Sequence, residues 1–244
     1  MQFNCDMGES FGPWVMGNDE AVMPHIDMAN IACGFHASDP VHMHRTIALA
    51  SQHLVRIGAH PGYPDLQGFG RRAMALSREE LFTSLLYQMG ALDALCKAQG
   101  TSVSYMKPHG ALYNQMMQDD AILDTVLASA AAFKPHCSVV VMAGVNDDKC
   151  RQLAKQHGGV PLLFEAFCDR LYNDDGTLVS RTHPDAVHGS IEQVINQVRG
   201  IVKHQTVTTI SGKQRPLKAD TICLHGDNTH LLQEIARIKD CLKP

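Results

Sequence analysis

The sequence predicts a single α/β domain over residues 1–244, built around a parallel sheet or a closed barrel. Apolar strand-like runs alternate with capped helical segments along the chain, which is the pattern of a parallel sheet. Seven of these runs end in a short cluster rich in Gly, His and Asp. No linker, internal repeat or low-complexity tract divides the chain, and 244 residues is an ordinary length for one barrel.

The seven clusters follow one another in chain order. They are NCDMGE at 4–9, NIACGFHASD at 30–39, IGAHPGYPD at 57–65, YMKPHGALYN at 105–114, VVVMAGVND at 139–147, LLFEAFCDR at 162–170 and ICLHGDN at 222–228. The carboxyl ends of parallel strands meet at one edge of a sheet or at one rim of a barrel. We therefore expect the clusters to form one site.

The helices between the clusters have clear start signals. Asp39 is expected to cap a helix that has Pro40 at its first position. Ser77 and Glu80 form a capping box for a second helix, which ends at Gly100. Later helices are expected to begin at Asp119 or Asp120, Asn146, Ser190 and Asn228, and two β-hairpins are expected at 170–181 and 206–219.

Composition excludes several classes of protein. The formal net charge is −4, so no basic surface is available to bind nucleic acid. No apolar run reaches the roughly 18 residues that a membrane span needs, and the sequence starts without a basic and apolar leader. The eight cysteines are dispersed without a C-x-x-C pair. We expect a cytoplasmic protein that binds neither nucleic acid nor membrane.

The clusters supply the candidate site residues. We predict catalytic roles for the acids, histidines and lysine at the strand ends, namely Asp6, Glu9, His36, His60, Lys107, His109, Glu165, Asp169, His225 and Asp227. We assign substrate binding to Asn4, Arg71, Arg72, Tyr113, Asn114 and Arg170. One strand-end histidine is weak evidence for catalysis, but several histidines and carboxylates at one rim are characteristic of an active site.

Spacing within two clusters indicates specific chemistry. Asp6 and Glu9 lie three residues apart around Gly8, so they could bind a cation or divide acid and base roles through mutual repulsion. Lys107 and His109 are predicted on the same side of an extended segment. A neighbouring cation lowers the pKa of a histidine, so His109 is expected to be a neutral base or ligand.

The sequence resembles the LamB/YcsF family over essentially its whole length. The resemblance is carried by NCDMGESFG, NIACGFHASDP, GAHPGYPDLQGFGRR, KPHGALYN, EAFCDRLY with GTLVSR, and CLHGDN. It implies a seven-stranded, TIM-like β/α barrel related to the polysaccharide-deacetylase-like barrels. It also implies an ATP-dependent hydrolase that opens 5-oxo-L-proline to L-glutamate together with 5-oxoprolinase subunits B and C. One departure is the first strand, because only 2–5 precede Asp6.

The nucleotide site is not visible in the sequence. A phosphate-binding loop of the form G-x-x-x-x-G-K-[ST] is absent, and Gly212-Lys213 is the one Gly-Lys pair in the chain. ATP must therefore bind through an unrecognised arrangement or in one of the partner proteins. A carboxylate or neutral histidine would serve as the base, and Lys107 or an arginine would stabilise the developing oxyanion.

Two alternative functions remain open at this point. The barrels related to this family are metal-dependent amide hydrolases that use an Asp and two histidines, and Asp6, His36 and His60 could form such a triad. The H-x-x-x-H spacing of those enzymes is absent, so the sequence leaves the presence of a divalent metal undecided. In the second alternative, the barrel only binds a substrate or partner subunits without catalysis.

Overall fold

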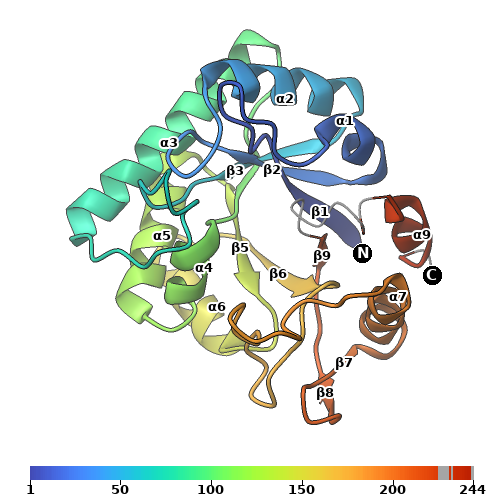
Figure 1. Ribbon diagram of the computed structural model, residues 1–244. Helices are drawn as coiled ribbons and strands as arrows, with labels where there is room; N and C mark the ends of the chain where they lie inside the picture. The colour runs from blue at the N-terminus through green and yellow to red at the C-terminus, as the bar shows by residue number, and fades with distance from the viewer. Residues whose placement is uncertain (225–230, 232, 243–244) are drawn as a thin grey trace.

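A closed barrel of seven parallel strands forms the centre of the molecule, as predicted. The computed structural model describes residues 1–224, 231 and 233–242 (Figure 1). In the order in which they pair around the barrel, the strands are β1 (Gln2–Met7), β2 (Met28–Ala32), β3 (Arg56–His60), β4 (Tyr105–Met106), β5 (Ser138–Met142), β6 (Leu162–Phe167) and β9 (Thr221–Leu224).

The first strand closes the barrel. Asn4 of β1 is in register with Met28 of β2 on one side and with Cys223 of β9 on the other. On its other side, β9 pairs with β6. β1 is six residues long, so Asp6 lies on the strand itself, whereas the sequence placed it after a shorter strand.

Helices surround the barrel (Figure 1). They are α1 (Asp19–Val22), α2 (Pro40–Gln52), α3 (Arg78–Ala98), α4 (Gly110–Met116), α5 (Asp120–Phe133), α6 (Asp147–Gln156), α7 (Ile191–Arg199) and α9 (Ile235–Asp240), with a 3-10 turn at Met23–His25 and a π-helical turn at Gly200–His204. The Asp39 side chain caps α2, and capping boxes form at the starts of α3 and α7. These helix starts are confirmed.

Two segments differ from the sequence prediction. β4 is only two residues long; His109 still has the extended backbone that was predicted for it, and α4 begins at the next residue, Gly110. The expected hairpin at 170–181 is an irregular turn with a single bridge between Tyr172 and Leu178. The other hairpin is confirmed as β7 (Thr206–Thr208) and β8 (Gln214–Pro216). The predicted helix start at Asn228 lies outside the described residues.

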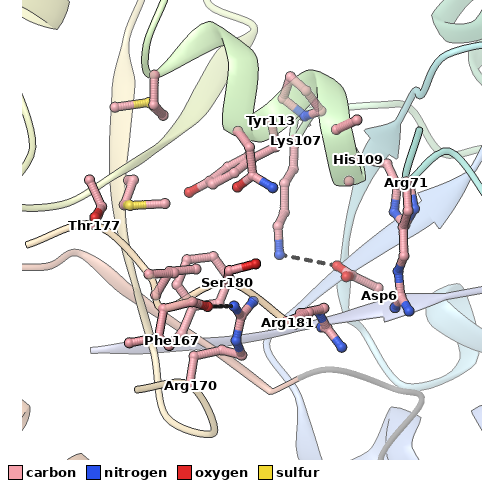
Figure 2. Close-up of a pocket in the computed structure, with 18 of the residues that line it drawn as sticks. Asp6, Arg71, Lys107, His109, Tyr113, Phe167, Arg170, Thr177, Ser180 and Arg181 are labelled. Atoms are coloured by element: carbon pink, nitrogen blue, oxygen red, sulfur yellow. Dashed lines mark hydrogen bonds and ion pairs between the residues drawn. The ribbon is translucent and has the colours of Figure 1, made fainter. Parts of the chain in front are cut away.

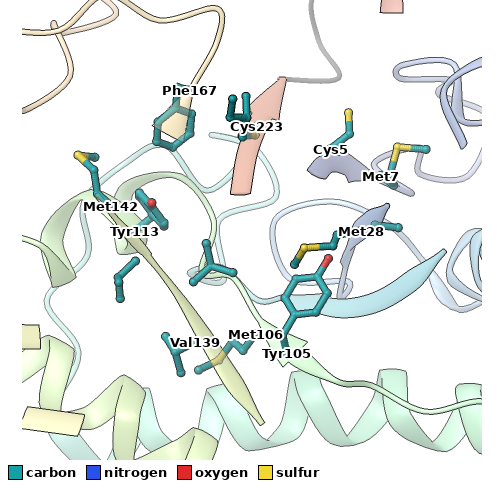
Figure 3. Packing of buried hydrophobic residues seen from close by; sticks show 14 of the residues in the cluster. Cys5, Met7, Met28, Tyr105, Met106, Tyr113, Val139, Met142, Phe167 and Cys223 are labelled. Carbon is teal, nitrogen blue, oxygen red and sulfur yellow. The ribbon is translucent and has the colours of Figure 1, made fainter. Parts of the chain in front are cut away.

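Alternation along the strands divides apolar from polar side chains. On β4, Met106 is fully buried among apolar neighbours outside the barrel interior (Figure 3). Tyr105 and Lys107, one residue to either side, turn inward because successive side chains of a strand point to opposite faces. The barrel interior therefore receives polar groups near its carboxyl rim. No helix in the described part of the chain is long and apolar enough to cross a membrane.

Candidate functional site

A cavity of about 720 Å³ opens at the carboxyl ends of the strands. The predicted residues that line it are Asp6, Glu9, His60, Arg71, Lys107, His109, Tyr113, Asn114 and Arg170. They come from several different strand ends and from α4, as the prediction of one shared rim requires. In Figure 2, the ammonium of Lys107 and the carboxylate of Asp6 face each other within this cavity.

Lys107 is a buried cation held between two carboxylates. Its Nζ lies 3.1 Å from Asp6 Oδ1 and 2.9 Å from Glu165 Oε1. It also lies 3.2 Å from Asn4 Oδ1. Burial alone would lower the pKa of Lys107, but the neighbouring Asp6 and Glu165 raise it well above its ordinary value. Lys107 therefore carries its positive charge at neutral pH.

A hydrogen-bonded network beneath Lys107 fixes this arrangement. The Asn30 amide donates to Asn4 Oδ1 and to Asp6 Oδ1, each at 2.8 Å. The Tyr105 hydroxyl donates to Asn30 Oδ1, and Asn4 donates to Thr221 Oγ1. Asn4 is fully buried and positions Lys107 from below, while the predicted role was direct contact with a substrate. Asp6 was predicted as a catalytic residue, whereas sequence reasoning did not single out Asn30, Tyr105 and Thr221.

Three histidines form a compact group beside Asp6. His60 Nε2 lies 2.9 Å from His109 Nδ1 and 3.5 Å from Asp6 Oδ2. The His36 ring stacks on the His109 ring with centroids 3.8 Å apart. Neither ring nitrogen of His36 has a hydrogen-bond partner among the described residues, although the side chain is fully buried.

Two of these histidines have lowered pKa values. Burial and the adjacent His60 lower the pKa of His109 to about 3. Burial and the stacked His109 lower the pKa of His36 well below its ordinary value. The sequence analysis also expected a lowered pKa for His109. It attributed the shift to Lys107, whereas in the structure burial and the neighbouring His60 are its main causes.

Glu9 joins the histidines in a group that could hold a metal ion. Its carboxylate and one nitrogen from each of His36, His60 and His109 all lie within 4.8 Å of one another. The sequence suggested a triad that used Asp6 as the carboxylate. In the structure Asp6 Oδ1 lies against Lys107 and Asn30, and Glu9 takes the place of Asp6 in the group.

Arginines surround the wider part of the cavity. Arg71, Arg170 and Arg181 all line it (Figure 2). Arg170 donates to the carbonyls of Val179 and Ala186, and burial together with the nearby Arg181 lowers its pKa to about 10. This concentration of guanidinium groups suits an anionic ligand.

Tyr113 provides a neutral hydroxyl on the same wall. It projects from α4, and its ring meets Phe167 edge-to-face with centroids 6.0 Å apart. Burial and the nearby Glu165 raise the pKa of Tyr113 well above its ordinary value. The hydroxyl therefore keeps its proton and can donate a hydrogen bond.

Some predicted residues lie away from the cavity lining. The Arg72 side chain is bound to Asp65 and is 64% exposed, so it does not reach the cavity. Asp169 is buried outside the lining residues, and Glu165 lies behind Lys107. His225 and Asp227 lie outside the described residues.

The segment that was expected to form a hairpin contributes an unpredicted wall. Besides the predicted Arg170, its cavity-lining members are Asn173, Thr177, Leu178, Val179, Ser180 and Arg181, and the next residue, Thr182, also lines the cavity. The sequence indicated a turn there but gave no sign that the turn covers the barrel mouth. The one available signal was the presence of GTLVSR among the motifs of the resemblance.

Comparison with known proteins agrees with this architecture. The family model described as the LamB/YcsF family matches residues 1–244. The chain belongs to the LamB/YcsF family. Among relatives, it is 54% identical over 242 residues to the 5-oxoprolinase A-subunit of Vibrio campbellii, covering 99% of this chain and 95% of the relative. It is 49% identical over 239 residues to the 5-oxoprolinase A-subunit of Pseudomonas fluorescens, covering 98% and 95%.

A solved structure of similar shape supports the same assignment. The lactam utilization protein from Thermus thermophilus superposes with a TM-score of 0.90 at 36% identity, covering 99% of this chain and 95% of that one. The LamB/YcsF barrel is thus shared with a solved protein of similar length.

Proposed function

We propose that this LamB/YcsF chain is the lactam-opening subunit of an ATP-dependent 5-oxoprolinase. The observation that carries the proposal is the charged Lys107 at the cavity floor, in a chain 54% identical to a protein named as the A-subunit of 5-oxoprolinase. The reaction hydrolyses the ring amide of 5-oxo-L-proline to give L-glutamate, and hydrolysis of ATP drives it.

The residues around the cavity fit the substrate. 5-Oxoproline carries a carboxylate, and Arg71, Arg170 and Arg181 are suitable partners for it. Attack of water on the lactam carbonyl puts negative charge on an oxygen, and Lys107 supplies a fixed positive charge for that oxygen. The Tyr113 hydroxyl keeps its proton and can donate to the lactam.

Asp6 is the proposed base. Its Oδ1 is held by Lys107 and Asn30, while Oδ2 faces His60 at 3.5 Å. A carboxylate fixed in this way can accept a proton from the attacking water and pass it toward the leaving nitrogen. The lactam is an unstrained amide, so transfer of the γ-phosphoryl group from ATP to its oxygen, with release of ADP, would make the ring carbon electrophilic enough for attack. Addition of water and cleavage of the ring C–N bond would then give a γ-glutamyl phosphate, and a second water would release glutamate and inorganic phosphate.

We propose that nucleotide binding requires partner proteins, the 5-oxoprolinase subunits B and C. The sequence has no phosphate-binding loop, and its one Gly-Lys pair lies in the turn between β7 and β8. The names of the relatives describe one component of a larger enzyme, which supports a multi-chain assembly. Dependence on ATP and the eight free cysteines support a cytoplasmic location.

One assay tests this function. Glutamate release from 5-oxoproline and ATP is measured with the isolated chain and again after addition of subunits B and C. We expect an inert isolated chain that becomes active in the mixture. Full activity of the isolated chain would disprove the dependence on partners. Hydrolysis of N-acetylated sugars with a divalent metal and no ATP would favour the deacetylase alternative.

A further inference from the structure

Two histidine rings in the site bring one ring nitrogen each to within 2.9 Å of the other, His60 Nε2 and His109 Nδ1. His60 Nδ1 lies 2.7 Å from the carbonyl oxygen of Lys107, and His109 Nε2 lies 2.8 Å from that of Phe69. A carbonyl oxygen can only accept a hydrogen bond, so each of these ring nitrogens must carry hydrogen. In a neutral imidazole the other nitrogen is then a bare acceptor. With both rings neutral, His60 Nε2 and His109 Nδ1 would be those acceptors, 2.9 Å apart.

Two facing acceptors repel unless something positive lies between or beside them. A cation that accepts both lone pairs would satisfy the pair and leave both carbonyl hydrogen bonds intact. Metal-binding histidines typically donate their second nitrogen to a carbonyl or carboxylate, which fixes the ring and its tautomer. His60 and His109 already have that outer arrangement.

Two further donors complete a ligand set. Among the described residues, His36 has no hydrogen-bond partner for either ring nitrogen, and it is fully buried. The Glu9 carboxylate adds a negative charge to the group. Ligands of one ion at about 2.1 Å can be at most about 4.2 Å apart. A pair at the observed limit of 4.8 Å must therefore close by about 0.6 Å if the two ligands lie on opposite sides of the ion, and by about 1.4 Å in the tetrahedral geometry usual for Zn²⁺.

Two glycines leave the space that the histidine side chains occupy. A Cβ at Gly62 would come within 2.7 Å of His36 Nδ1. A Cβ at Gly70, which has φ +63°, would come within 2.8 Å of both His36 and His109. The backbone at these two positions thus packs directly against the histidine rings, and a larger residue would displace them.

We propose that Glu9, His36, His60 and His109 bind one divalent transition-metal ion. Three imidazoles and one carboxylate suit Zn²⁺, Fe²⁺ or Co²⁺ and disfavour Mg²⁺, which prefers oxygen ligands. The ion proposed here therefore differs from the Mg²⁺ that accompanies ATP, which prefers oxygen ligands. Glu9, His60 and His109 line the cavity, so a bound ion would present a Lewis acid to the ligand there.

Direct binding tests the proposal without reference to the reaction. The chain is stripped with a chelator, dialysed against Zn²⁺ or Co²⁺ and analysed for metal content. We expect about one equivalent of metal per chain. Co²⁺ should give the visible absorption of an ion with nitrogen ligands. Since neither ATP nor 5-oxoproline is added, failure to bind metal and failure of the proposed function are separate results.

Variants locate the site. His36→Gln and Glu9→Gln should each lower metal affinity at least about 10-fold. His44→Gln, on the exposed face of α2, is the matched control and should bind like the wild type. Circular dichroism confirms that each variant is folded. If a variant does not fold, the wild-type stoichiometry and Co²⁺ spectrum still decide the matter.

Three results would overturn the proposal. The first is a wild-type chain that binds neither Zn²⁺ nor Co²⁺. The second is metal binding that His44→Gln abolishes and His36→Gln leaves intact. The third is a ¹⁵N spectrum of metal-treated protein in which His60 and His109 share a single proton, because that proton would occupy the space assigned to the ion.

Discussion

Asp6 on β1 and Lys107 at the end of β4 meet across the interior of the barrel, with Oδ1 and Nζ 3.1 Å apart. The other oxygen of the same carboxylate lies 3.5 Å from His60 Nε2. Asp6 thus connects the buried cation to the histidine group. Changes at either residue should affect both chemistry and stability, and the two effects can be separated by the variants below.

Replacement of Lys107 by Met removes the cation and leaves Asp6 and Glu165 facing each other in a buried setting. We expect turnover in the reconstituted enzyme to fall about 100-fold or more. The free energy of unfolding should fall by about 3 kcal/mol, because the carboxylates lose their partner. Addition of Glu165→Gln should restore part of the stability in urea denaturation without restoring activity. A double variant that recovers turnover would contradict the role of Lys107.

Replacement of Asp6 by Asn keeps the shape of the side chain and removes its basicity. We expect kcat to fall about 100-fold with the fold preserved. The control is Asp148→Asn, which changes a fully exposed carboxylate on α6 and should leave kcat unchanged. Near-normal kcat in the Asp6 variant would assign the base to another residue.

Arg71 and Arg72 form a natural matched pair. Arg71 lines the cavity, whereas Arg72 is bound to Asp65 outside it. Arg71→Gln should raise the KM for 5-oxoproline about 10-fold, because a charged hydrogen bond to the substrate is lost. Arg72→Gln should leave KM nearly unchanged. Equal effects of the two substitutions would show that Arg71 does not contact the substrate.

The acid stability of the fold should depend on Asp93. Burial raises the pKa of Asp93, but hydrogen bonds from Lys97 and from the Val103 N–H lower it by more, so the folded value lies below the ordinary one. The carboxylate therefore adds stability above about pH 4, and this contribution is lost as pH falls through the folded pKa. The stability difference between wild type and Asp93→Asn, measured by urea titration, should shrink on acidification. A difference that grows toward low pH would contradict this assignment.

Thiol chemistry should be confined to one cysteine. Burial raises the pKa of Cys33, Cys96 and Cys137 to about 12 and that of Cys150 to about 11. Cys5, Cys168 and Cys223 are also buried with raised pKa values. Cys241 is partly exposed. Iodoacetamide at pH 8 should modify Cys241 in the folded chain, as peptide mapping would show, and rapid modification of the others would contradict their burial.

Local signals in the sequence predicted the framework well. Asp39, Ser77 and Ser190 cap the expected helices. Each side-chain oxygen accepts a hydrogen bond from a backbone N–H in the first turn of its helix, so a suitable residue at that position is enough to predict the helix start. The strand ends also predicted the common rim. Capping and the alternation of apolar and polar residues depend on neighbouring positions in the chain, so a single sequence is enough to predict them.

Partners across the barrel could not be predicted in the same way. The contacts of Asn30 with Asp6 and of Tyr105 with Asn30 depend on the register between strands that are far apart in the sequence. Glu9 lies within reach of all three histidines, whereas Asp6 approaches His60 with one oxygen. Gly8, at φ +68°, turns the chain between the two carboxylates. Such choices follow from tertiary geometry, and spacing along the chain does not determine them.

Closure of the barrel between β1 and β9 has a consequence for synthesis of the protein. During translation Asp6 leaves the ribosome well before Glu165 and β9, the strand that joins β1 to β6. One edge of β1 therefore stays unpaired until the residues between β2 and β9 have been made. Pairings of such large sequence separation form slowly and expose strand edges in the meantime. Completion of the ion pairs around Lys107 should thus be a late step in folding.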